Sequence, residues 1–166
     1  MKHTSPLIGL LALAMWLTPT SEAKAEDWPQ WFGPKRDGIS LERANWVSTW
    51  TDSGPKVRWS RALGPGFSSF ALVGDTGYTM ASDGPHVAVV AFDVKSGEDR
   101  WRTRIGQAYT DHMGGDGPRA TPTVVGDRLY TLGPSGTLVA LHAKTGRLLW
   151  MRHIAHEFGG EVPKWG

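Results

Sequence analysis

The chain has 166 residues, and its 18 lysines and arginines nearly balance 16 acidic residues, giving a formal net charge of +2. The basic residues are spread along the chain, which argues against a nucleic-acid partner, because nucleic-acid-binding surfaces carry a basic stripe. Cysteine is absent, which excludes disulfides, zinc–thiolate sites and thiol nucleophiles, and 21 glycines with 9 tryptophans favour an all-β repeat protein.

Residues 1–25 are predicted to be a signal peptide. An apolar run of about eleven residues, Leu7–Leu17, follows a polar start and is shorter than the ~20 residues that cross a bilayer. Ser21–Ala23 and Ala23–Ala25 both fit the small-residue pattern of a cleavage site. We therefore expect a periplasmic or secreted protein with no membrane span after cleavage. An uncleaved membrane anchor is the alternative.

Residues 26–61 are predicted to be an N-terminal arm followed by a closing strand. The segment Asp27–Ile39 is aromatic and broken by prolines, and we expect an ordered arm because Trp28, Trp31 and Phe32 would bury their rings. A floppy N-terminus is the alternative. Val57–Ser60, centred on Trp59, resembles the last strand of the repeats described next, without the three strands that precede it there.

Two landmarks recur in the same order along the rest of the chain. Ala91–Trp101 and Ala140–Trp150 share Ala, Ser/Thr, Gly and Trp at identical offsets, 49 residues apart. Upstream, Val-Gly-Asp recurs at a spacing of 52 residues, each time followed by a tyrosine, Tyr78 or Tyr130. Such a period indicates a repeat architecture, in which one unit cannot bury its own apolar face and must stack on a neighbour.

Each repeat divides into four short apolar runs separated by turn residues, which predicts an antiparallel meander. The first repeat occupies 62–106 and the second 107–155, and 156–166 reads as the start of a further repeat. The predicted strands are 69–73, 78–81, 87–92, 100–105, 120–125, 128–132, 137–141 and 147–154.

Six residues are predicted to hold the repeats together. Asp93 is suited to accept backbone N–H bonds across its turn, and glycine at the closing position takes a left-handed conformation. The tryptophan that follows is suited to fill the wedge between neighbouring sheets. The structural set is Trp59, Asp93, Gly97, Trp101, Gly146 and Trp150.

The pattern A-x-D-x-x-[ST]-G-x-x-x-W, with V-G-D-x-x-Y upstream, resembles the tryptophan-docking repeat of quinoprotein-type (PQQ-like) β-propellers. This superfamily includes pyrroloquinoline quinone (PQQ) dependent alcohol dehydrogenases, the BamB-type assembly scaffold and exported PQQ-like repeat proteins. The resemblance covers about Asp27–Gly166. It implies an all-β partial β-propeller: two four-stranded antiparallel blades, an N-terminal closing strand and the stub of a third blade.

Propellers of this family have more blades than two, so we expect the chain to be a fragment, a truncated reading frame or one piece of a split gene. A small open stack or a ring of several copies is the alternative. The family's enzymes, as the resemblance implies, hold PQQ with Ca²⁺ beside an unusual disulfide. This chain has no cysteine, and no catalytic, cofactor or metal residue is matched. PQQ with Ca²⁺ therefore belongs only to the alternative of a dehydrogenase fragment.

The loop between the repeats carries the most site-like residues. It places two carboxylates, an imidazole and a guanidinium on glycine-rich backbone, a set that could bind a hard cation or transfer protons. The candidates are Asp111, His112, Asp116 and Arg119. His153, His156 and Glu157 lack the H-E-x-x-H order of zinc proteases, and His86 reads as a solvated turn residue.

The sequence thus favours an exported, non-catalytic propeller scaffold that binds protein or glycan through its loops. The alternative is a fragment of a PQQ-dependent quinoprotein oxidoreductase.

Overall fold

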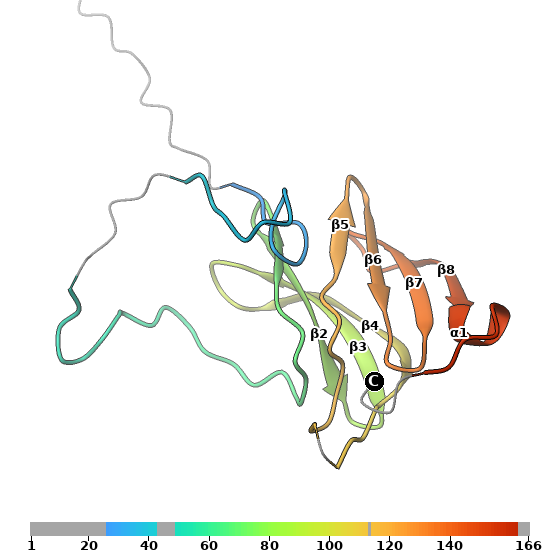
Figure 1. Ribbon diagram of the computed structural model, residues 1–166. Helices are drawn as coiled ribbons and strands as arrows, with labels where there is room; N and C mark the ends of the chain where they lie inside the picture. Colours follow the sequence, from blue (N-terminus) through green and yellow to red (C-terminus); the bar gives the residue numbers. More distant parts are fainter. Residues whose placement is uncertain (1–25, 43–48, 113, 163–166) are drawn as a thin grey trace, which may run out of the picture.

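The computed structural model describes residues 26–42, 49–112 and 114–162 of the chain (Figure 1). Two four-stranded antiparallel sheets lie side by side, with strand orders β1-β2-β3-β4 and β5-β6-β7-β8. The elements are β1 (Ala71–Val73), β2 (Thr76–Asp83), β3 (His86–Asp93), β4 (Asp99–Gln107), β5 (Thr123–Val125), β6 (Arg128–Leu132), β7 (Thr137–His142), β8 (Leu148–His153) and α1 (Ile154–Glu157). The predicted all-β class and the two four-stranded repeats are confirmed.

The turn between β3 and β4 shows why the repeat needs its aspartate and glycine. Asp93 Oδ1 accepts the backbone N–H groups of Lys95 at 2.8 Å and Ser96 at 3.0 Å. Gly97, with φ 77°, donates its N–H to the Asp93 carbonyl at 2.8 Å. In the β7–β8 turn Gly146 has φ 68° and bonds the His142 carbonyl at 2.8 Å. Both turns close in the left-handed region, where glycine meets no Cβ clash.

The hydrophobic core lies between the two sheets. Alternate residues of β2 and β3, such as Met80 and Val89, pack with Leu129, Val139 and Leu141 of the second sheet in one cluster of buried residues. This burial removes the apolar face of each sheet from water, at roughly 25 cal/mol per Å². Neither sheet could bury that face alone, as the repeat pattern predicted.

One tryptophan docks on a turn of the neighbouring sheet at each of two contacts, and we call each contact a joint. Trp101 on β4 donates its indole N–H to the Ala143 carbonyl of the β7–β8 turn at 2.9 Å. Its ring covers Gly146 so closely that a Cβ there would lie 2.5 Å from Trp101 Cε3. Thr103, two residues further along β4, donates its hydroxyl to the Gly146 carbonyl at 2.8 Å.

Trp59 makes the same joint with the first sheet. Its indole N–H bonds the Val94 carbonyl at 2.9 Å, and a Cβ on Gly97 would lie 2.6 Å from Trp59 Cε3. Arg61 stands where Thr103 stands in the other joint, bonds the Gly97 carbonyl and pairs with Asp99 at 2.6 Å.

The two repeated landmarks touch each other within each sheet. The ring centroids of Tyr78 and Trp101 are 6.0 Å apart with an interplanar angle of 50°. Those of Tyr130 and Trp150 are 6.1 Å apart at 46°. The tyrosine therefore supports its tryptophan from the same sheet, which explains why the two recur together.

The N-terminal segment departs from the prediction in two ways. Val57–Ser60 is not a strand: within the described residues it pairs with no strand, and the Trp59 side chain attaches it to the β3–β4 turn instead. In the arm, Trp28 exchanges backbone bonds with Leu72 at 2.7 and 2.8 Å, but Trp31 and Phe32 stay 56% and 50% exposed. The expectation that these two rings are buried is wrong.

Both ends of the chain lie partly outside the described residues. Residues 1–25, predicted as a signal peptide, and the last four residues of the predicted repeat start at 156–166 lie outside the described residues. Among those that are described, no helix is long and apolar enough to cross a membrane. Strand β8 ends at His153, and the four-residue helix α1 begins at Ile154.

Candidate functional site

The loop between the sheets is organised around Arg119. Its guanidinium lies 5.2 Å from the ring centroid of Phe67 and 5.4 Å from that of Tyr109. It donates to Asp111 Oδ2 at 3.2 Å and to the carbonyls of Gly115 and Gly117 at 3.1 Å each. Cation–π contacts and charge-assisted bonds of this kind fix a loop firmly.

The other candidate residues of the loop divide into two groups. Asp116 Oδ1 accepts the backbone N–H of Asp111 at 3.1 Å, so Asp111, Asp116 and Arg119 come together and brace the loop. His112 is exposed and takes no part in these bonds. The four do not converge as an acid–base or metal-binding set. In the described part of the chain, no group of three or more His, Asp or Glu side chains could hold a metal ion.

The C-terminal histidines are also placed separately. His153 Nδ1 contacts the Thr137 hydroxyl at 3.0 Å, whereas Glu157 pairs with Arg152, which lowers the pKa of that carboxyl. Trp150, the third tryptophan of the series, remains 39% exposed on β8. Leu148 and Met151 are exposed on the same strand, so β8 leaves three large apolar side chains partly open to solvent.

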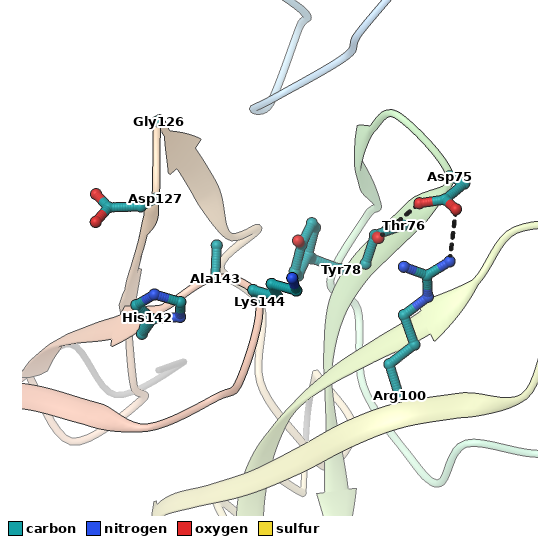
Figure 2. A pocket seen from close by; sticks show the side chains of 9 residues that line it. All are labelled: Asp75, Thr76, Tyr78, Arg100, Gly126, Asp127, His142, Ala143 and Lys144. Atoms are coloured by element: carbon teal, nitrogen blue, oxygen red, sulfur yellow. Dashed lines mark hydrogen bonds and ion pairs between the residues drawn. The ribbon is translucent and has the colours of Figure 1, made fainter.

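A cavity of about 460 Å³ opens between the two sheets at the end that holds their β1–β2 and β7–β8 turns. Figure 2 shows the residues that line it, which come from both sheets. The lining residues are Asp75, Thr76, Tyr78, Arg100, Gly126, Asp127, His142, Ala143 and Lys144.

The half of the cavity formed by the first sheet is a closed set of ion pairs. Arg100 bridges Asp75 at 2.9 Å and Asp93 at 2.7 Å. The Arg100 guanidinium and the backbone bonds from Ser96 and Lys95 lower the pKa of Asp93 to about 2. Arg100 also lowers the pKa of Asp75, whereas burial raises the pKa of Tyr78. Both carboxyls therefore stay charged.

The half formed by the second sheet lacks that arrangement, because the repeats differ there. His142 stands at the position of Asp93, and Leu149 stands where the 49-residue period would repeat Arg100. Within the described residues, the side chain of Asp127, the counterpart of Asp75, forms one ion pair, with Arg128 at 3.8 Å. The ammonium group of Lys144 extends toward Tyr78 across the gap (Figure 2). This wall can bind a polar or charged group of a partner.

This cavity was not predicted from the sequence, because the turn residues were interpreted as structural only. The positions where the two copies differ, Asp93 against His142 and Arg100 against Leu149, were the signal that could have found it.

Two stacked four-stranded antiparallel sheets, joined by tryptophans that dock on the next turn, define a pair of β-propeller blades. The sequence model of the family described as outer membrane protein assembly factor BamB matches residues 39–162. The chain belongs to this family.

A relative in Shewanella oneidensis supports this family assignment. Over 116 residues the chain is 35% identical to the outer membrane protein assembly factor BamB of Shewanella oneidensis, covering 65% of this chain and 28% of that protein. The chain thus spans less than a third of that relative's length.

Solved structures with a similar fold include BamB of Moraxella catarrhalis, with 18% identity, a TM-score of 0.35 and coverage of 52% of this chain and 22% of that one. Another is a europium-containing methanol dehydrogenase, with 21% identity, a TM-score of 0.46 and coverage of 59% and 18%. At these values neither likeness says anything about the function of this chain.

Proposed function

We propose that these two blades belong to an exported, non-catalytic propeller scaffold that takes part in the assembly of outer membrane proteins by binding another protein. The observation that carries the proposal is the family match over residues 39–162, together with the name of the Shewanella relative. Periplasmic or cell-envelope localisation is part of the same proposal.

The loop at 108–119 is the surface through which we propose that a protein partner binds. Arg119 holds it in one shape through Phe67, Tyr109 and Asp111. A loop that is already ordered loses little conformational entropy on binding, which favours recognition. His112 stands exposed on this braced loop and is therefore a suitable probe position.

A site-specific photo-crosslinker in place of His112, introduced into the protein in its native envelope, tests the proposal. We expect a crosslink to an outer membrane protein or to a component of its assembly, identified by mass spectrometry. The matched control replaces Lys95, an exposed turn residue at the opposite end of the sheets, and should give no such product. Equal products from both positions, or none from His112, would contradict binding through this loop.

The alternative of a dehydrogenase fragment predicts a different result. In that case the purified protein would take up PQQ in the presence of Ca²⁺ and show the absorbance of bound cofactor. Uptake of PQQ together with dye-linked alcohol oxidation would replace the scaffold proposal.

A further inference from the structure

The N-terminal arm, residues 27–39, is a loop fixed to the first strands of both sheets. Trp28 is bonded to β1, and the Pro29 carbonyl accepts a backbone N–H of β5 at 2.8 Å. Asp27 Oδ1 accepts a backbone N–H of the β1–β2 turn at 2.7 Å. The arm thus lies at the end of the sheets opposite the loop at 108–119, which is bonded to the β2–β3 turn (Figure 1).

The arm contains two residues other than glycine in the left-handed region, Phe32 with φ 62° and Arg36 with φ 58°. Residues with a side chain rarely adopt this conformation, and those that do gather at functional sites where the surrounding structure holds them. Here the Phe32 carbonyl accepts the N–H of Gly38 at 2.9 Å, and Arg36 Nε donates to Gln30 Oε1 at 3.1 Å. The arm therefore holds an unfavourable backbone shape through its own hydrogen bonds.

This shape leaves two aromatic rings in solvent. Trp31 and Phe32 are about half exposed, and their ring centroids lie 4.9 Å apart in an edge-to-face arrangement. A cavity of about 240 Å³ opens beside them, lined by Gln30, Trp31, Phe32, Arg36 and Thr123. This volume is below the ~300–1,000 Å³ of small-molecule sites, so the cavity has room for one side chain of a partner.

The two cations beside the rings are available to a partner. Within the described residues, neither Lys35 nor Arg36 forms an ion pair, and Arg36 Nη1 and Nη2 make no hydrogen bond. The neighbouring carboxylate, Asp37, accepts the backbone N–H of Ile39 with Oδ1 at 3.0 Å. A carboxylate is the group that a guanidinium binds most strongly, so charge complementarity favours an acidic partner.

We propose that the arm binds a peptide segment of a partner protein in which an aromatic residue stands next to an acidic one. The aromatic side chain enters the cavity beside Trp31 and Phe32, where ring pairs gain more than their buried area alone. The neighbouring carboxylate pairs with Arg36. This surface is separate from the loop at 108–119, so binding through either one can fail without the other.

A lipid bilayer fits the arm less well than a peptide does. The carboxylates of residues 26–42 are Glu26, Asp27, Asp37 and Glu42, and the cations are Lys35 and Arg36. Because acidic residues outnumber basic ones, an anionic bilayer surface repels the segment as a whole. A bilayer also presents no single side chain to fill a cavity.

Resonances of the isotope-labelled protein, titrated with the peptide acetyl-GSFDFSG-amide, test the proposal. We expect the peptide to shift the indole N–H resonance of Trp31 and the amide resonance of Arg36. The peptides acetyl-GSSDSSG-amide and acetyl-GSFKFSG-amide, which lack the rings or reverse the charge, should each bind at least about threefold more weakly.

Two variants with matched controls give a second check. Trp31→Ala should weaken binding of the first peptide about tenfold, and Arg36→Gln should weaken it about two- to fivefold, as expected for an exposed ion pair. Trp50→Ala and Arg58→Gln change exposed residues outside the arm and should bind as the unchanged protein does.

Three results would overturn the proposal. They are the absence of shifts with the first peptide, equal binding of all three peptides, and equal binding by Trp31→Ala and the unchanged protein. If the peptide does not bind but the protein sediments with phosphatidylcholine–phosphatidylglycerol vesicles in a manner that depends on Trp31, the arm is reassigned to a membrane surface.

Discussion

The variant Gly146→Ala measures how much the tryptophan joint contributes to stability. A Cβ at this position would lie 2.5 Å from Trp101 Cε3 and 2.7 Å from Thr103 Oγ1, so the ring must move away from the turn. Gly126→Ala is the matched control in the same sheet. Gly126 has a similar φ of 58°, and an added Cβ there would meet nothing within 4 Å.

The expected magnitudes follow from these two environments. Both variants force alanine into the left-handed region, at a cost of roughly 1–2 kcal/mol. Only Gly146→Ala adds an overpacked contact, which typically costs about 1–3 kcal/mol. We therefore expect the control to lose about 1–2 kcal/mol of unfolding free energy. Gly146→Ala should lose about 2–5 kcal/mol, the sum of the two effects.

Urea denaturation followed by circular dichroism gives both free energies by linear extrapolation. Repeating the pair in a Trp101→Ala background isolates the contribution of the ring, because Gly146→Ala then keeps only its close approach to Thr103 Oγ1 and should cost less than it does with Trp101 present. In the protein that retains Trp101, the free energies lost by Gly146→Ala and Gly126→Ala should differ clearly. A difference below about 0.5 kcal/mol, which is within ordinary additivity error, would refute the docking of Trp101 on Gly146.

Three further predictions concern single side chains. Arg100 and two backbone N–H groups lower the pKa of Asp93 from 3.8 to about 2, so the stabilising effect of its charge is complete above pH 3.8 and is lost as the pH falls toward 2. In Asp93→Asn the urea midpoint should therefore depend less on pH between 3.8 and 2 than in the unchanged protein. An equal dependence in both proteins would contradict this prediction. Trp101→Phe removes the bond to the Ala143 carbonyl and should lower the unfolding free energy by about 1–3 kcal/mol in urea titrations, since that carbonyl loses its partner. Arg119→Lys cannot keep all three donor bonds and both ring contacts, so hydrogen exchange of the Gly117 amide should accelerate; unchanged protection would argue against the brace.

The strands and their order could be predicted because each depends on local signals. Short apolar runs and left-handed glycines set the strands and turns, and the recurrence of Trp101 and Trp150 in matching contexts indicated that one sheet docks on the next. The placement of Trp101 between the two sheets was predicted, although its contact with Gly146 and its hydrogen bond to the Ala143 carbonyl were not.

The failures came from interactions between distant residues. Val57–Ser60 has a strand-like sequence, but a strand forms only where it pairs with another strand. The sequence of the segment does not show whether such a partner strand is present. The role of Arg119 as a brace depends on Phe67, which lies more than fifty residues earlier. The site roles assigned to the loop residues stay predictions.

The receiving side of each joint is made almost entirely of main chain. The acceptors are the carbonyls of Val94, Gly97, Ala143 and Gly146, and the only side-chain requirement is that glycine leave room for an indole. A turn of this kind therefore offers the same acceptors to a docking tryptophan even where its side chains differ, as His142 in place of Asp93 shows. Sequence change in the turns leaves the docking bonds intact, whereas the apolar side chains packed between the sheets decide how well two units fit.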